Sequence, residues 1–69
     1  VLLQRFRELT PKQIQVLSYL RAGLMNKQIA HEMNVTEATI KAHISAILRK
    51  LEINTRTQAV LLMDKLQLS

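Results

Sequence analysis

The 69-residue chain contains no cysteine, which excludes disulfides, thiolate metal sites and cysteine nucleophiles together. A reducing cytoplasm permits this composition, and we expect a cytoplasmic protein. The sequence also lacks an apolar run approaching about 18 residues and a charged-then-apolar leader, so it predicts no membrane span and no membrane partner.

Glycine, proline and aromatic residues are almost as scarce, with one glycine, one proline, one tyrosine, one phenylalanine and no tryptophan. No run of alternating apolar residues is bounded by turn dipeptides, so the residues predict an all-helical fold. A chain of this length supports one small domain. Proteins that bind RNA or single-stranded DNA commonly stack the bases on aromatic side chains. The shortage of aromatic rings therefore makes these weaker candidate partners than duplex DNA, should the chain bind a nucleic acid.

Acidic residues are outnumbered, because ten lysines and arginines face five aspartates and glutamates, for a net charge of +5. This balance favours a polyanionic partner, although charge alone does not separate DNA from RNA or an acidic membrane surface. The acidic residues are scattered, and no nucleophile motif or glycine-rich loop is present, so we predict no enzyme and no cofactor. His31 and His43 lack the further ligands that a metal site needs.

The stretch 26–51 has the signals of two helices joined by a tight turn. Asn34 can take the left-handed conformation that ends the first helix, and Thr36 can cap the second. Val35 and Ile40 have the spacing of a hydrophobic staple, which fixes the angle of entry into the second helix. Ala30 is small where the two helices cross. The pattern predicts a helix-turn-helix.

The second of these helices, 37–51, has two faces of opposite character at about 100° per residue. Its apolar stripe consists of Ile40, Ile44, Ile47, Leu48 and Leu51. The opposite arc consists of Ala38, Lys41, Ala42, Ser45 and Arg49. Because that arc has no bulky apolar group, a nucleic-acid groove can approach it closely. His43 lies at the edge of the stripe, where we favour packing over a phosphate contact.

Capping boxes place the remaining helices. Thr10 and Gln13, with Pro11 at the first helical position, begin a helix whose core face is Ile14, Leu17 and Leu20, flanked by Val16, and Gly23 closes it. Thr55 and Gln58 begin the last helix. We predict four helices at 11–22, 26–33, 37–51 and 56–67, in a domain spanning 9–69. Residues 1–8 are either the end of a linker or a short helix laid over the domain.

The last helix has apolar residues on both faces. Its inward face is predicted to consist of Ala59, Leu62, Met63 and Leu66. The outward face is either covered by residues 1–8 or left exposed, or else it pairs with a second copy, and we favour pairing. The predicted dimer interface is then Thr57, Val60, Leu61, Asp64 and Leu68.

Four spaced blocks resemble the LuxR-type, or GerE-like, helix-turn-helix family: LTPKQIQVL at 9–17, AGLMNKQIA at 22–30, MNVTEATIKAH at 33–43 and KLEINTRTQA at 50–59. This domain forms the C-terminal effector part of FixJ/NarL response regulators and of quorum-sensing regulators. The resemblance implies duplex-DNA reading by the third helix, and dimerisation through the fourth in the response-regulator branch. It also implies an N-terminal receiver or signal-binding domain. The chain begins with Val rather than Met, which fits a fragment of such a protein.

Carried over by position, the resemblance places Lys41, Ala42 and Ser45 at base edges. It places phosphate contacts at Asn26, Lys27, Thr36, Thr39 and Arg49. Lys50, on the shoulder of the helix, either contacts a phosphate or is solvated.

The chain departs from the family pattern at three positions. Gln13 replaces the Glu that pairs with the Arg matching Arg56, so we expect a hydrogen bond there instead of an ion pair. Met25 replaces a Ser, Thr or Pro and supplies no cap oxygen. Ser45 is shorter than the cationic side chains of some relatives, which predicts a narrower or more water-mediated readout.

We therefore predict sequence-specific duplex-DNA binding by the effector domain of a bacterial transcription regulator, with helix 37–51 in the major groove and homodimerisation through helix 56–67. The alternative is a protein–protein interaction module that uses the exposed apolar face of the last helix. A membrane-surface helix fits less well, because the apolar stripe of 37–51 is needed for the core.

Overall fold

The computed structural model describes residues 2–65, and all the regular structure in this range is helical. The helices are α1 (Leu2–Arg7), α2 (Pro11–Arg21), α3 (Asn26–Met33), α4 (Glu37–Leu51) and α5 (Arg56–Lys65). The all-helical prediction is confirmed: the four predicted helices correspond to α2–α5, and residues 2–7 form the additional short helix α1. Residues 66 and 67, predicted as the end of the last helix, lie outside the described residues. So do Leu66, predicted for its inward face, and Leu68, predicted for the dimer interface.

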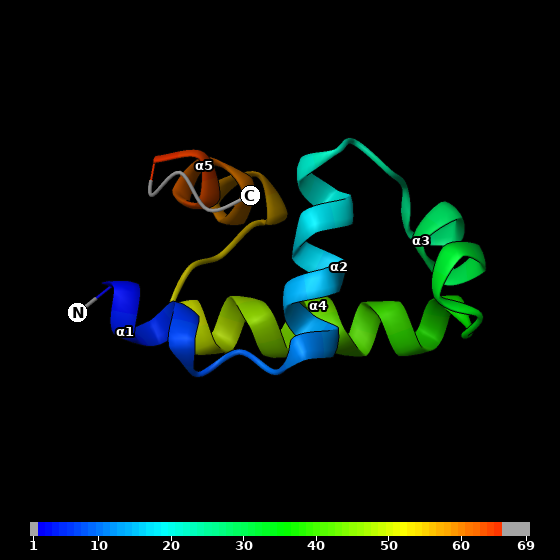
Figure 1. The fold of residues 1–69 in the computed structure, drawn as a ribbon, viewed down its shortest axis with the longest axis horizontal. Helices are drawn as coiled ribbons and strands as arrows, with labels where there is room; N and C mark the ends of the chain where they lie inside the picture. The colour runs from blue at the N-terminus through cyan, green and yellow to red at the C-terminus, as the bar shows by residue number, and fades with distance from the viewer. Residues whose placement is uncertain (1, 66–69) are drawn as a thin grey trace.

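The longest helix, α4, is the element on which the others pack. Figure 1 shows α2 crossing α4, with α3 at one end of α4 and α1 at the other. α1, α2, α3 and α5 all contact α4, and α5 also contacts α2. Every element of the described chain is therefore fixed relative to the second helix of the helix-turn-helix.

The core lies along the stripe that the periodicity predicted. Ile40, Ile47 and Leu51 of α4 are fully buried, and Ile44 is buried beside them. The buried residues that meet this stripe are Phe6, Leu9, Val16, Leu17, Leu20, Ile29, Ala30, Ala59 and Met63. Because Phe6 and Leu9 belong to this cluster, α1 is the short helix laid over the domain, the second of the two interpretations of residues 1–8.

One core position of α2 was predicted wrongly. Ile14 is 45% exposed, whereas its neighbour Gln13 is only 7% exposed and lies with Val16, Leu17 and Leu20 on the buried side. Those four positions have the spacing i, i+3, i+4, i+7 of one helix face, and Ile14 is about 100° away from Gln13 around the helix. A polar residue occupies this face because its carboxamide finds hydrogen-bond partners there.

The predicted helix ends are largely confirmed. The Thr10 hydroxyl accepts from the Gln13 backbone N–H at 3.1 Å, and Gln13 Oε1 accepts from the Thr10 N–H at 3.0 Å. α2 ends at Arg21, one residue earlier than predicted, and Gly23 follows with φ +92°. The Thr55–Gln58 capping box is formed as well, at 3.2 and 3.1 Å.

The far end of α4 is tied to the N-terminal part of the chain by polar contacts. Lys50 Nζ donates to the Glu8 carbonyl at 3.0 Å and to Gln13 Oε1 at 3.1 Å. Arg5 Nη2 pairs with Glu52 Oε2 at 3.1 Å, where Glu52 ends α4 in the left-handed conformation. The Lys50 contacts explain the buried Gln13, because its oxygen receives both a backbone N–H and a charged donor.

We expect Lys50→Met to lower the free energy of unfolding by roughly 1–2 kcal/mol, because two hydrogen bonds are lost while the aliphatic stem is kept. Urea denaturation followed by circular dichroism measures the change. Lys12→Met is the matched control, since Lys12 is exposed on α2. Equal stability of the two variants would contradict a structural role for Lys50.

Candidate nucleic-acid interface

The turn between α3 and α4 has the conformation that its residues predicted. Asn34 is left-handed, with φ 57° and ψ 46°, and the Val35 N–H donates back to the Ala30 carbonyl at 2.9 Å. The Thr36 hydroxyl accepts from the Thr39 N–H at 3.2 Å and so caps α4. These local hydrogen bonds hold the start of α4 against α3 and fix which side of α4 faces outward.

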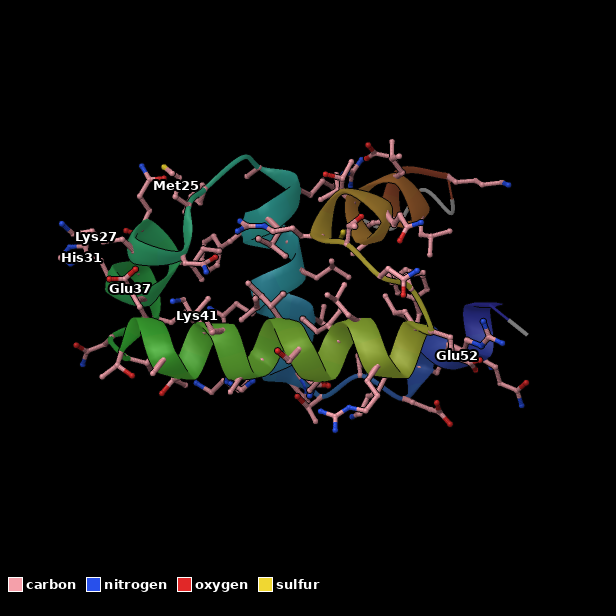
Figure 2. All side chains as sticks on the ribbon, turned by 180° about the vertical axis from the view of Figure 1, so that it is seen from behind. Met25, Lys27, His31, Glu37, Lys41 and Glu52 are labelled. Carbon is pink, nitrogen blue, oxygen red and sulfur yellow. The ribbon has the colours of Figure 1, made fainter. Side chains whose placement is uncertain are left out.

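The side of α4 opposite the core is open along its length. The residues of this side, called here the free face, are all exposed: Ala38, Lys41, Ala42, Ser45 and Arg49. In the described part of the chain no hydrogen bond or ion pair engages the side chain of Lys41 or Ser45. Figure 2 shows Lys41 on the half of α4 nearest Lys27 and His31 of α3. The three predicted base-contact residues are thus together and unobstructed.

The residues predicted to contact phosphates differ in exposure. Lys27, Thr36 and Arg49 are exposed, whereas Asn26 and Thr39 are half-buried. The Thr36 and Thr39 hydroxyl oxygens lie 3.1 Å apart, so one of the two hydroxyls donates a hydrogen bond to the other. Because each hydroxyl carries one proton, the pair retains a single outward donor, so it can make one phosphate hydrogen bond as donor rather than two.

Two of the positions singled out in the sequence have other contacts than those expected. Lys50 uses two of its three N–H donors inside the domain, so we remove it from the candidate phosphate contacts. The expected Gln13–Arg56 hydrogen bond is not formed in the described residues, because Gln13 Oε1 is engaged by Lys50 and Thr10. Met25, at the N-cap of α3, is exposed and makes no side-chain cap, as its chemistry predicted.

The predicted dimer residues differ in their exposure and contacts. Thr57 and Leu61 are exposed, and Leu61 is 61% exposed. Val60 is half-buried against the core, so it points outward only in part. Asp64 Oδ1 accepts from Arg21 Nε at 2.5 Å within the domain. Leu68 lies outside the described residues.

Two hollows lie beside these helices. One of about 210 Å³ is formed by Leu20, Arg56, Thr57 and Val60 at the start of α5. Another, of about 490 Å³, lies at the start of α3 and is lined by Met25, Asn26, Lys27, Glu37 and Arg56.

His43 is half-buried at the edge of the stripe. None of the described helices combines the length and apolar content needed to cross a bilayer.

The chain is similar in sequence to known bacterial regulators. The chain is 53% identical over 53 residues to a glycerol metabolism activator of Pseudomonas putida, covering 77% of this chain and 24% of that protein. It is 46% identical over 57 residues to the nitrate/nitrite response regulator protein NarP of Escherichia coli, covering 83% of this chain and 26% of the relative. The chain thus spans about a quarter of the length of these curated relatives.

The fold has a close counterpart among solved structures. The response regulator StyR, solved at low resolution, superposes with a TM-score of 0.88 at 42% sequence identity, over 93% of this chain and 32% of that one. Residues 7–63 match the family model described as bacterial regulatory proteins, luxR family. The chain therefore belongs to the LuxR family of bacterial regulatory proteins, in which the matched segment is a DNA-binding domain of transcription regulators and not an enzyme.

Proposed function

We propose that the domain binds duplex DNA sequence-specifically by inserting α4 into the major groove. The observation that carries this proposal is the free face, which is exposed while the opposite stripe of α4 is buried. Lys41 can donate to guanine O6 and N7, and Ser45 can donate to or accept from a base edge at short range. Ala42 lies beside them on the same face and has only a methyl group, so the helix backbone can come close to the bases.

The proposed phosphate contacts are Arg49 of the free face, Asn26 and Lys27 at the start of α3, and Thr36 and Thr39 at the start of α4. Contacts of this kind set the register of the protein on the duplex and carry no sequence information directly. Lys27 and Arg49 are exposed cations, and the Thr36–Thr39 pair supplies one outward hydroxyl proton. The net charge of +5 supports an association driven in part by counterion release.

We expect Lys41→Ala to weaken binding to a site selected from random duplexes by about 1–3 kcal/mol, and to have a much smaller effect on random DNA. Lys27→Ala should weaken both duplexes alike, and should reduce the salt slope of log affinity by about 0.9 per protomer. Fluorescence anisotropy titrations over a range of salt concentrations measure both quantities.

Lys12→Ala is the control for the loss of a positive charge, because Lys12 is exposed near the start of α2 and is not part of the free face. Equal losses on selected and random duplexes for Lys41→Ala would contradict a base-reading role. An affinity of the unaltered domain that does not change with salt would contradict duplex binding altogether.

We further propose that two copies pair through α5 on DNA, with Leu61 at the centre of the contact. Leu61 is the most exposed large apolar residue of α5, and the hollow formed by Leu20, Arg56, Thr57 and Val60 lies on the same helix. Asp64 already has Arg21 as a partner inside the domain, so its part in the interface is limited to what that ion pair leaves accessible.

We expect Leu61→Glu to leave the fold unchanged, because the side chain is largely exposed, and to abolish the paired occupancy of two half-sites. Footprinting on a selected duplex with two half-sites measures occupancy, and sedimentation velocity measures the dimer. Ile14→Glu is the matched control, since Ile14 is an exposed apolar residue of α2. Paired occupancy that survives Leu61→Glu would place the interface elsewhere.

The full-length protein, by this proposal, is a cytoplasmic bacterial regulator with a receiver or signal-binding domain on the N-terminal side of α1. The chain spans 24% and 26% of two relatives, and NarP and StyR are both named response regulators. Control of access to the α5 surface by that domain would then regulate DNA binding, because two linked contacts bind far more tightly than one.

A further inference from the structure

Three helices begin around one hollow of about 490 Å³, called here the junction hollow. Asn26 is the first residue of α3, Glu37 the first of α4 and Arg56 the first of α5. Met25 and Lys27 complete the lining. Figure 2 shows Met25, Lys27 and Glu37 at the same end of the molecule as Lys41. The hollow is therefore beside the free face of α4, and Arg56 reaches it from a different helix.

The cations of the junction hollow have no carboxylate partner in the described part of the chain. Arg56 and Lys27 are exposed, and neither takes part in the two ion pairs found there. Glu37 is the single acidic residue of the lining, so the hollow has a formal charge of +1. Gln13, where the family pattern has a Glu, is neutral and bound to Lys50, so α2 supplies no competing charge at that position.

Asn26, one of the residues that line the junction hollow, has a buried acceptor without a donor. Asn26 Oδ1 is shielded from solvent and has no hydrogen-bond partner, which is unusual for a buried polar atom. A guanidinium has five N–H donors in a planar fork, so it can satisfy this oxygen and still bind an anion. Arg56 lines the same hollow as Asn26 and is the side chain with that capacity.

We propose that Arg56 is a further DNA-binding residue, whose guanidinium donates to Asn26 Oδ1 and to a backbone phosphate held jointly with Lys27. The inference rests on the proposed binding of duplex DNA by α4, because it is the free face that brings a phosphate to the hollow. Asn26 is a positioning residue for Arg56 as well as a neighbour of the phosphate. The interface then extends from α3 to the first residue of α5.

The main test compares Arg56→Gln with Arg7→Gln in salt-dependent anisotropy titrations on selected and random duplexes. Arg7 is an exposed arginine of α1, at the other end of α4 from the junction hollow. We expect Arg56→Gln to lower the salt slope by about 0.9 per protomer, and to weaken both duplexes equally, roughly five- to tenfold per protomer at about 0.1 M salt. Arg7→Gln should leave the slope unchanged.

Two further variants separate a guanidinium fork from a simple charge. Arg56→Lys should keep the salt slope and lose part of the affinity, because an ammonium cannot serve Asn26 and the phosphate in one plane. Asn26→Ala should weaken binding when Arg56 is present and should have a smaller effect in the Arg56→Gln background. Additive losses in this double-mutant cycle would overturn the Asn26–Arg56 link.

The unaltered domain and Lys41→Ala, measured alongside, distinguish the two levels of the hypothesis. If the unaltered domain shows no salt-dependent duplex binding, the proposed function fails. If Lys41→Ala behaves as predicted but Arg56→Gln matches Arg7→Gln in slope, the function stands and the Arg56 inference is overturned. A loss of dimer in sedimentation velocity with an unchanged slope for Arg56→Gln would also overturn it.

Discussion

The structure depends on the burial of one stripe of α4, formed by Ile40, Ile44, Ile47 and Leu51. Burying an aliphatic side chain of this size is worth about 1.5–3 kcal/mol, so the four together contribute on the order of the whole stability of a small domain. Turning α4 by a quarter turn would expose them. The rotation of α4 about its own axis is therefore fixed as firmly as the fold, and the free face with Lys41 is held outward without any residue of that face contributing to the core.

Local patterns were sufficient for most of the fold. The capping residues Thr10, Thr36 and Thr55 gave the starts of three helices, and Asn34 gave the turn, because a cap is a contact over a few residues. The sequence did not show that Gln13, and not Ile14, is buried in the core. That burial depends on Lys50, which lies 37 residues along the chain from Gln13 and reaches it only after α4 has docked. The sequence left two interpretations of residues 1–8 for a related reason. α1 has only six residues, and Phe6 packs into a core formed by residues distant in the sequence.

The candidate site shows the same division. Lys41, Ala42 and Ser45 share one face because of the period of a single helix, so their common exposure could be predicted from spacing alone. The junction hollow could not, since Asn26 and Arg56 belong to helices whose starting points meet only in the folded molecule. The surroundings of Gln13, Lys50 and Arg56 were not visible in the sequence, because these long side chains meet residues of other helices.

The tie between α1 and the end of α4 determines where the domain can be attached to other parts of a protein. Arg5 holds Glu52, and Lys50 holds the Glu8 carbonyl, so the chain enters the domain beside the last turn of α4. Figure 2 shows Glu52 at the opposite end of α4 from Lys41. A bulky domain joined through α1 would lie beside the C-terminal end of α4, about four helical turns from its N-terminal end, and would leave Lys41 clear of the point of attachment.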